Sequence, residues 1–448
     1  MSKLLITFYG DDFTGSTDAL EQLTLAGIRT ALFIEPPTPA QLKQHPGLQA
    51  IGVAGTTRAL SPAAMEKELR PALQKLKALG PRHVHYKICS TFDSSPKVGS
   101  IGRVIDVARK LFPAPFVPVL AAAPALGRYT LFGNHFARFG IGSDGEIHRL
   151  DRHPSISKHP VTPMLEADLC RHLARQTKRR IALFDVLKVS LPETESRAAF
   201  KCLLAEQPEI VLFDALDREH LKRIGRLMEM YASSRRPLFS VGSSGIETAL
   251  ASVWSGARRN PEANQQVSPA SSATGQILVG SGSCSPVTQG QIAWALEHGF
   301  TEVPINLAAF AADHTREIRH CIKATKDLLQ QGRSVIVHTI KRGADKQIGA
   351  RLKNGTAQGL GMALGLILKN ALKVRSCRLC IAGGDTSSFA ARALGIEAME
   401  MIAPLTPGAP LCRAIAPRSP ADGLEVVFKG GQVGAENYFK TVLGTVQK

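Results

Sequence analysis

The sequence predicts an α/β protein with two Rossmann-like domains, whose mostly parallel sheets face each other across an active-site cleft. Short apolar runs alternate with helix-like segments along most of the chain, which is typical of parallel sheets. One long polar stretch interrupts this alternation near the middle. The length of 448 residues is roughly three times a typical domain of about 150. A composition of 44% hydrophobic and 21% charged residues excludes a disordered or fibrous chain.

The first strand–loop–helix–strand unit opens the chain. Residues 3–9 form an apolar strand, residues 10–15 break it, and residues 18–26 have leucines at helical spacing before Gly27, a helix-ending glycine. Residues 29–34 return to a strand pattern.

The same pattern recurs through the first half. Further strands are expected at residues 50–54, 83–88, 116–121, 181–184, 210–213 and 238–241. Helices are expected at residues 62–79, 97–111 and 218–231. Residues 128–150 are rich in glycine and aromatic side chains and predict antiparallel hairpins.

A polar segment rich in Pro, Ser and Ala around residues 258–275 predicts a linker. We therefore expect a first domain at 1–258, a linker at 259–274 and a second domain at 275–448. In the second domain, strands are expected at residues 276–280, 301–306, 334–339 and 378–382. Helices are expected at residues 287–298, 315–330 and 349–372.

The chain is basic, with 55 Lys and Arg against 37 Asp and Glu, a net charge of +18. Such a charge favours an anionic partner, either a nucleotide, an acidic metabolite, a nucleic acid or a membrane surface. The basic residues are dispersed and only 6% of residues are aromatic, too few for extensive base stacking. We therefore expect small anionic ligands rather than nucleic acid.

Eight scattered cysteines are typical of a reduced cytoplasmic enzyme rather than a disulfide framework. Cys377 and Cys380 have CxxC spacing, but no second pair completes a zinc site, so we expect them in the core. The N-terminus predicts a strand rather than a signal peptide. No apolar run is as long as the about 18 residues that a membrane-spanning helix needs. No metal ligands were identified.

The loops after the strands of a parallel sheet share one edge, where ligands bind. Asp11 and Asp12 follow the first strand directly. They could orient substrate hydroxyls, accept a proton or hold Mg²⁺, or one could simply cap the next helix. Arg58, Lys87 and Arg128 follow other strands, and we expect them to converge on a substrate carboxylate.

The corresponding loops of the second domain are rich in Gly, Ser and Thr, which suits phosphate because backbone amides can approach closely at a helix N-terminus. Tight turns without a ligand are the alternative for each loop alone. None matches the Walker pattern. These loops contain Ser281, Ser283 and Ser285, then Lys341-Arg342-Gly343, then Gly383, Gly384, Asp385 and Thr386, and finally Gly430 and Gly431.

In order along nearly the whole chain, seven motifs resemble those of the four-carbon acid sugar kinase family. They lie at residues 9–15, 57–58, 123–133, 241–245, 281–288, 383–386 and 429–434. The resemblance implies a domain for an acid sugar, a domain for ATP, and transfer of the γ-phosphoryl group to a hydroxyl. It implies erythronate, threonate, oxo-tetronate or the branched 3-oxo-isoapionate as substrate.

By position, the resemblance implies that Asp11, Asp12, Arg58, Lys87, Ser90 and Arg128 face the substrate. Asp12 is the base that we expect, with Asp11 the alternate. It implies that Ser281, Ser283, Ser285, Gly383, Gly384, Asp385, Thr386, Gly430 and Gly431 face ATP. ATP and Mg²⁺ are the expected cofactors, and the sequence leaves a homodimer open.

The sequence departs from the family pattern after the third strand. Where the family has Lys-x-Asp-Ser-Thr-Leu-Arg-Gly, residues 87–94 place Cys89 in the position of the acid and Asp93 in that of the arginine. The site thus loses one charge of each sign and gains an acid. This change favours a ketonic or branched acid over a plain tetronate as the substrate.

Two other functions compete. Gly280-x-Gly282-x-x-Ser285 follows a strand and precedes a helix, and Glu302 lies 20 positions beyond Gly282, as in an NAD(P)-dependent oxidoreductase. However, Ser285 replaces the third glycine of that motif. A cofactor-free nucleic-acid-binding protein is the weaker alternative, because the charge is dispersed.

Overall fold

The computed structural model describes residues 4–139, 145–159, 161–255, 275–283, 285–339 and 356–444. The expected linker and the loop Lys341-Arg342-Gly343 lie outside these residues, as does the side chain of Asp385. The chain forms two compact units, Met1–Ala31 with Glu35–Gln266, and Leu32–Ile34 with Val267–Lys448. No helix in the described ranges is long and apolar enough to cross a bilayer.

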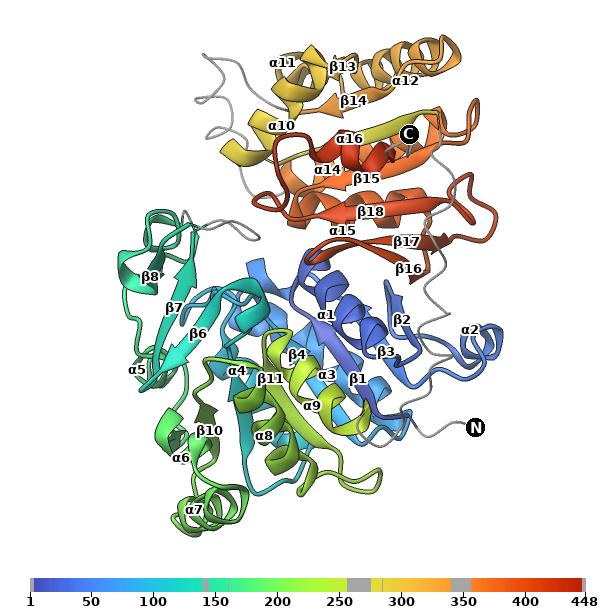
Figure 1. The fold of residues 1–448 in the computed structure, drawn as a ribbon. Helices are drawn as coiled ribbons and strands as arrows, with labels where there is room; N and C mark the ends of the chain where they lie inside the picture. The colour runs from blue at the N-terminus through green and yellow to red at the C-terminus, as the bar shows by residue number, and fades with distance from the viewer. Residues whose placement is uncertain are drawn as a thin grey trace. The chain divides into compact units, whose positions relative to one another are not determined.

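The first unit is a parallel sheet with helices on both faces (Figure 1). Its strands run in the spatial order β3, β1, β4, β11, β5, β10, β9. Their bounds are β1 (Ile6–Gly10), β3 (Ala50–Ala54), β4 (His83–Lys87), β5 (Val117–Leu120), β9 (Ile181–Phe184), β10 (Ile210–Phe213) and β11 (Leu238–Gly242). Nearly all strand residues are buried, as expected of a sheet covered on both faces.

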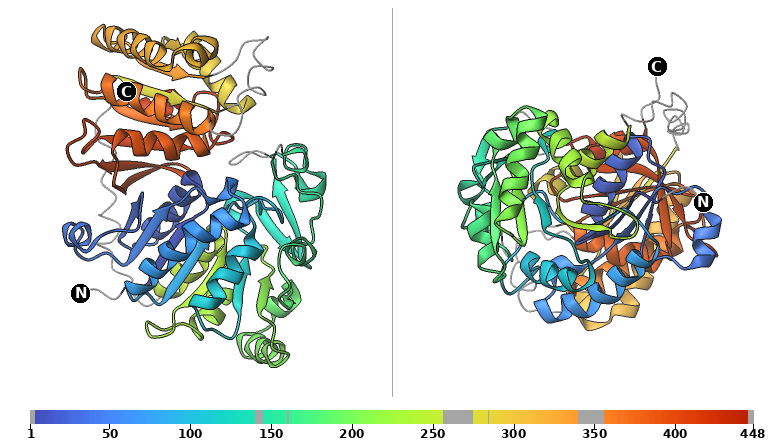
Figure 2. Two further views of the ribbon diagram at one scale, coloured as in Figure 1. Left: turned by 180° about the vertical axis from the view of Figure 1, so that it is seen from behind. Right: turned by 90° about the horizontal axis from the view of Figure 1, so that it is seen from below.

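Helices α1, α8 and α9 cover one face of this sheet and α3 and α4 the other (Figures 1 and 2). Their bounds are α1 (Phe13–Leu25), α3 (Pro62–Ala78), α4 (Ile101–Leu111), α8 (Arg218–Glu229) and α9 (Gly245–Ser255). The remaining helices of this unit are α2 (Pro39–Gln44), α5 (Leu169–Ala174), α6 (Val186–Ser190) and α7 (Glu193–Ala205).

The hairpins expected at residues 128–150 are confirmed as a separate antiparallel sheet. It contains β6 (Arg128–Leu131), β7 (Asn134–Arg138) and β8 (Ile147–Arg149).

The second unit is also an α/β sheet, and it confirms the expected fold class. The spatial order is β13, β14, β12, β15, β18, β17, β16. The first five strands are parallel to one another, and β17 is antiparallel to both of its neighbours, β18 and β16. The strands are β12 (Ile277–Ser281), β13 (Thr301–Pro304), β14 (Val335–His338), β15 (Arg378–Ala382), β16 (Ala398–Thr406), β17 (Ala409–Ile415) and β18 (Glu425–Lys429). The helices are α10 (Pro286–Glu297), α11 (Leu307–Ala312), α12 (His314–Gln330), α14 (Thr356–Ala371), α15 (Gly384–Leu394) and α16 (Tyr438–Leu443).

The strand expected at residues 29–34 is present as β2 (Thr30–Phe33), but part of it belongs to the second unit. Leu32–Ile34 group with that unit, because β2 pairs antiparallel with β16, with Phe33 opposite Ala398. In addition, the Ile34 amide donates to the Glu397 carbonyl. Cys377 and Cys380, which were expected in the core, are both buried.

Strand β4 has one apolar and one polar face. Val84 and Tyr86 pack into the core, whereas His83, His85 and Lys87 point to the opposite face because side chains alternate along a strand. Each of the three meets an acid from a different helix. His83 bonds Glu229 of α8, His85 Nε2 lies 3.5 Å from Glu247 of α9, and Lys87 pairs with Asp18 of α1.

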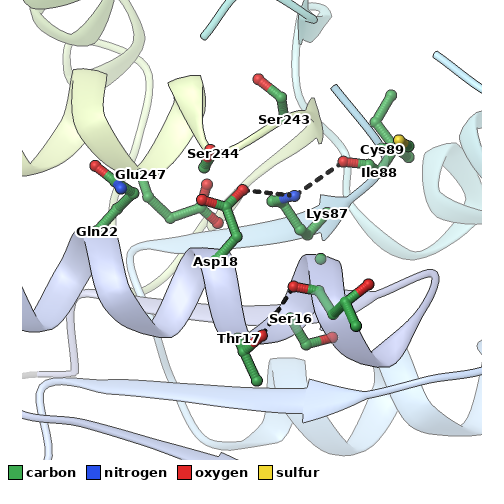
Figure 3. Close-up of polar contacts among 12 residues, drawn as sticks. Ser16, Thr17, Asp18, Gln22, Lys87, Ile88, Cys89, Ser243, Ser244 and Glu247 are labelled. Atoms are coloured by element: carbon green, nitrogen blue, oxygen red, sulfur yellow. Dashed lines mark hydrogen bonds and ion pairs between the residues drawn. The ribbon is translucent and has the colours of Figure 1, made fainter. Parts of the chain in front are cut away.

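Glu247 is the most unusual of these acids. Its side chain is fully buried, and neither carboxylate oxygen has a hydrogen-bond partner among the described residues. Figure 3 shows Glu247 beside Asp18 and Lys87. Burial raises the pKa of Glu247 to about 8, and the Asp18 charge adds to this shift while Lys87 opposes it. Glu247 is therefore protonated at neutral pH.

We expect Glu247→Gln to stabilise the protein increasingly as pH rises from 4.5 to 8. An unfolded Glu ionises near 4.5, whereas the folded group keeps its proton until about 8, so the wild type loses stability across this window. The gain could reach about 5 kcal/mol, because one pKa unit corresponds to about 1.4 kcal/mol.

Urea unfolding at several pH values would measure the difference between variant and wild type. Glu195→Gln, at an exposed position on α7, is the matched control and should leave the pH dependence unchanged. Equal pH dependence of wild type and Glu247→Gln would show that Glu247 is ionised in the folded protein.

Candidate functional site

The carboxyl ends of neighbouring strands bring the predicted substrate residues of the first unit to one edge. β1 pairs with β3 on one side and β4 on the other, with Gly10 opposite both Ala54 and Lys87. Asp11 and Asp12 therefore follow β1 between the segment that contains Arg58 and the segment that begins at Ile88.

Arg58 binds both aspartates. It lies on a short 3₁₀ turn, Thr57–Ala59. Its Nη2 donates to Asp11 Oδ1 at 2.7 Å, its Nε to Asp11 Oδ2 at 3.1 Å, and its Nη1 to Asp12 Oδ2 at 2.7 Å. The side chains of Asp11 and Asp12 are 4% and 8% exposed, and that of Arg58 is 23% exposed. One guanidinium thus bonds two adjacent carboxylates and remains accessible from solvent.

The two aspartates differ in how fully they are bonded. Asp12 caps α1: Oδ1 accepts from the Gly15 amide at 2.7 Å, and Oδ2 accepts from Thr14 Oγ1 at 3.0 Å besides Arg58. The capping role that the sequence allowed is therefore present. Asp11 accepts side-chain bonds from Arg58 alone, which leaves lone pairs free on a carboxylate with about four acceptor sites.

The acidity of Asp11 is perturbed by its surroundings. Burial raises the pKa of Asp11 to about 6, with the Asp12 charge adding to the shift and Arg58 opposing it. A carboxylate whose pKa lies near neutrality suits general-base chemistry.

Lys87 is not a free cation at this edge. It is 1% exposed, and its Nζ lies 3.2 Å from Asp18 Oδ2 and donates to the Ile88 carbonyl at 3.0 Å (Figure 3). A methyl group on Gly15 would come within 3.4 Å of Lys87 Nζ and 2.6 Å of Asp12 Oδ1. Lys87 therefore supports the first turn of α1 from within the core.

The loop after β4 is held tightly. Ser90 is buried, and its carbonyl accepts from His135 Nε2 at 2.8 Å. Cys89 Sγ lies 2.9 Å from Thr91 Oγ1, which donates to Asp93 Oδ1 at 2.7 Å. Burial raises the pKa of Cys89 to about 12, so this residue is a neutral thiol and not a nucleophile.

Arg128 has carbonyl partners in addition to the substrate carboxylate on which we expect it to converge with Arg58 and Lys87, and that convergence stays a prediction. Its Nη1 donates to the carbonyls of Leu126 at 3.0 Å, Gly127 at 3.3 Å and Arg138 at 3.0 Å. Nη1 thus joins the loop after β5 to the antiparallel sheet, whereas the buried Nε has no hydrogen-bond partner among the described residues.

In the second unit, the glycine loops meet. A methyl group on Gly282 would lie 2.2 Å from Thr386 Oγ1, and one on Gly431 would lie 2.7 Å from Ser283 Oγ. One on Gly383, whose φ is +117°, would lie 3.3 Å from the Ser283 amide. The loops after β12, β15 and β18 therefore touch, and glycine is required at each contact.

This cradle has the donors that phosphate needs. The hydroxyls of Ser281, Ser285 and Ser387 are buried without a hydrogen-bond partner among the described residues. Ser285 begins α10 and makes no side-chain cap, which leaves the helix N-terminus open to an anion. Gly384 opens α15 after Gly383, and Gly430 follows β18 directly.

The sequence analysis assigned no role to four residues near these sites. Asp18 and Glu247 lie on helices whose sequences are typical of amphipathic helices with a polar face in solvent. Their burial could be inferred only from the buried β4 side chains that they contact. Gln291 donates to the carbonyls of Val433, Gly434 and Ala435 at 2.9–3.0 Å. Lys429 stands directly before Gly430, and its charge at the end of an apolar strand was the available signal.

Two family models match the chain. A sugar-binding N-terminal domain matches residues 6–250 and a nucleotide-binding C-terminal domain matches residues 278–439. The Gly280–Ser285 loop thus lies in the nucleotide-binding match.

Three relatives that are named as kinases match this chain over nearly their whole length. A 3-oxo-isoapionate kinase of Paraburkholderia graminis is 42% identical, covering 98% of this chain and 94% of the relative. A 3-oxo-tetronate kinase of Pseudomonas savastanoi pv. phaseolicola is 28% identical, covering 99% and 97%. A 3-oxo-tetronate kinase of Salmonella typhimurium is 29% identical, covering 97% and 98%.

Solved structures share the fold. A Salmonella typhimurium LT2 protein, solved under the provisional description of a tRNA synthase, superposes with a TM-score of 0.77 at 26% identity, covering 98% of both chains. A Haemophilus influenzae protein superposes with a TM-score of 0.69 at 22% identity, covering 98% of this chain and 99% of that one. The kinase relatives exclude the oxidoreductase alternative and make this chain a phosphotransferase that acts on a sugar acid. The chain belongs to the four-carbon acid sugar kinase family.

Proposed function

We propose that this kinase transfers the γ-phosphoryl group of ATP to a hydroxyl of a branched 3-oxo sugar acid of the 3-oxo-isoapionate type. The supporting observation is the 42% identity to a 3-oxo-isoapionate kinase, against 28–29% to 3-oxo-tetronate kinases of similar coverage. The neutral thiol of Cys89, in the position where the family pattern has an acid, is consistent with a substrate other than a plain tetronate.

We further propose that the first unit binds the sugar acid and the second binds ATP. The first unit has the partly exposed Arg58 between two carboxylates, a polar site for hydroxyl groups. The second has three touching glycine loops and buried free hydroxyls, which suit phosphate. The boundaries 1–258, 259–274 and 275–448 remain part of this proposal.

The substrate hydroxyl is proposed to lose its proton to Asp11. Asp11 has lone pairs beyond those bonded to Arg58, whereas Asp12 is committed to capping α1. Arg58 holds Asp11 in place and keeps it ionised above a pH of about 6. Asp12 as the base stays a prediction that mutation can test. The fully buried Lys87 acts by fixing the first turn of α1.

In a kinase, most of the rate enhancement comes from alignment of the reactants and neutralisation of the charge on the transferred phosphoryl group. Magnesium bound to the phosphates contributes to that neutralisation. Magnesium is proposed to arrive with ATP, since Mg²⁺ keeps waters and phosphate oxygens as ligands. In the described ranges, no group of three His, Cys, Asp or Glu side chains could hold a metal ion.

The substrate assignment predicts a preference in kcat/KM. A coupled assay of ADP release should give at least about 10-fold higher kcat/KM for 3-oxo-isoapionate than for 3-oxo-tetronate, because a missing or extra substrate group is worth 10-fold or more in a shaped pocket. Equal or reversed preference would move the assignment to the linear acids while leaving the sugar acid kinase function intact.

The base assignment predicts that Asp11→Asn lowers kcat by about 10²–10⁴-fold with little change in the KM for ATP. In the wild type, kcat/KM for the acid should rise with pH and level off above about 6, since Asp11 must be ionised to accept a proton.

Asp12→Asn is the matched comparison. It keeps an oxygen for the α1 cap, so a smaller loss of kcat and an unchanged pH limb are expected. If Asp12→Asn instead causes the larger loss, Asp12 is the base, as first expected from the sequence.

The nucleotide assignment predicts that Gly282→Ala raises the KM for ATP at least about 10-fold. The added methyl would lie within 3.1 Å of three Thr386 side-chain atoms and push the two loops apart. Gly290→Ala, where nothing lies within 4 Å, is the control on α10. An unchanged affinity of Gly282→Ala for ATP in calorimetry would remove the cradle from the nucleotide site.

A further inference from the structure

Lys429, the last residue of β18, is a buried cation without a carboxylate partner. It is 0% exposed. Its Nζ donates to Thr288 Oγ1 at 3.1 Å and lies 5.4 Å from the centre of the Tyr438 ring. No ion pair joins it to an acid in the part of the chain that the structure describes. Lys87 is equally buried, but it has Asp18 as a partner at 3.2 Å.

The surroundings of Lys429 offer little compensation for its charge. Its titratable neighbours are Cys380 on β15, a buried neutral thiol, and Tyr438 on α16, while α10 contributes the hydroxyl of Thr288. Glu425, at the other end of β18, pairs with Arg378. A buried ammonium without a partner is costly, so its presence here calls for a source of negative charge.

Lys429 also joins two loops of the cradle. Thr288 Oγ1, which accepts from Lys429 Nζ, donates to the Gly431 carbonyl at 2.9 Å. The Lys429 carbonyl accepts from the Gly383 amide at 2.9 Å. The charge therefore lies directly under the glycine loops and cannot be displaced without moving them.

We propose that Lys429 is the buried counter-charge of the nucleotide site, and that the phosphates of ATP supply the negative partner that the described part of the chain does not. This proposal rests on the assignment of ATP to the second unit. Lys429 is a positioning residue: it does not touch the phosphates, but its charge acts on them through a medium of low dielectric, where such interactions are strong over several ångströms.

The proposal has a measurable consequence. Burial lowers the pKa of Lys429 to about 8, so part of the population has lost its proton near that pH. Bound phosphate raises the pKa again, since opposite charges favour the ionised form. ATP binding near pH 8 must therefore take up protons from the buffer.

The experiment is ATP titration of the full chain by calorimetry at pH 8, in two buffers of different ionisation enthalpy. The wild type should take up as much as about half a proton per site, because a group near its pKa is half ionised. Lys429→Met should take up none and bind ATP at least about 10-fold more weakly. Its thermal midpoint should rise, because an unpaired buried charge has been removed.

Lys440→Met, at an exposed position on the neighbouring helix α16, removes the same charge at the surface and should resemble the wild type. Wild-type affinity and proton uptake in Lys429→Met would overturn the proposal. So would weaker binding with a lower thermal midpoint and unchanged proton uptake, which would indicate packing alone. Failure of the underlying ATP assignment would show separately, as unchanged ATP affinity in Gly282→Ala.

Discussion

The carboxyl edge of the first sheet depends on the contact of Arg58 with Asp11 and Asp12. Two consecutive buried aspartates repel each other, and they can remain together only beside a cation with several donors in one plane. Arg58 supplies three such bonds. The parallel pairing of β1 with β3 brings it there, because Gly10 and Ala54 end opposite each other. The strand register therefore determines the electrostatics of the site.

The buried lysines of the two units differ in their partners. In the first unit Lys87 has Asp18, as Arg58 has both aspartates. In the second, Lys429 has only neutral neighbours among the residues that the structure describes. A site of that kind favours an anion, and the stability lost in the empty protein is returned when the anion binds.

Much of the fold could be predicted from the sequence, because buried parallel strands read as apolar runs and each is followed by a loop at the same edge. This logic found Asp11, Asp12, Arg58 and the glycine loops. For Arg128 the contact with an anion stays a prediction, because this residue follows a strand as expected but its Nη1 already bonds three carbonyls. Position in a sequence indicates which edge a side chain reaches, not which partners compete for it.

Two of the residues to which the sequence assigned no role share one physical origin. Asp18 and Glu247 lie on helices α1 and α9, where a charged residue normally indicates solvent. They are buried because β4 has a histidine and a lysine at alternate positions facing these helices. Burial of a charge depends on pairs of elements far apart in the chain, whereas periodicity reports one element at a time. The same reasoning explains residues 32–34, whose apolar pattern predicts a strand but not the antiparallel partner, β16, that they join.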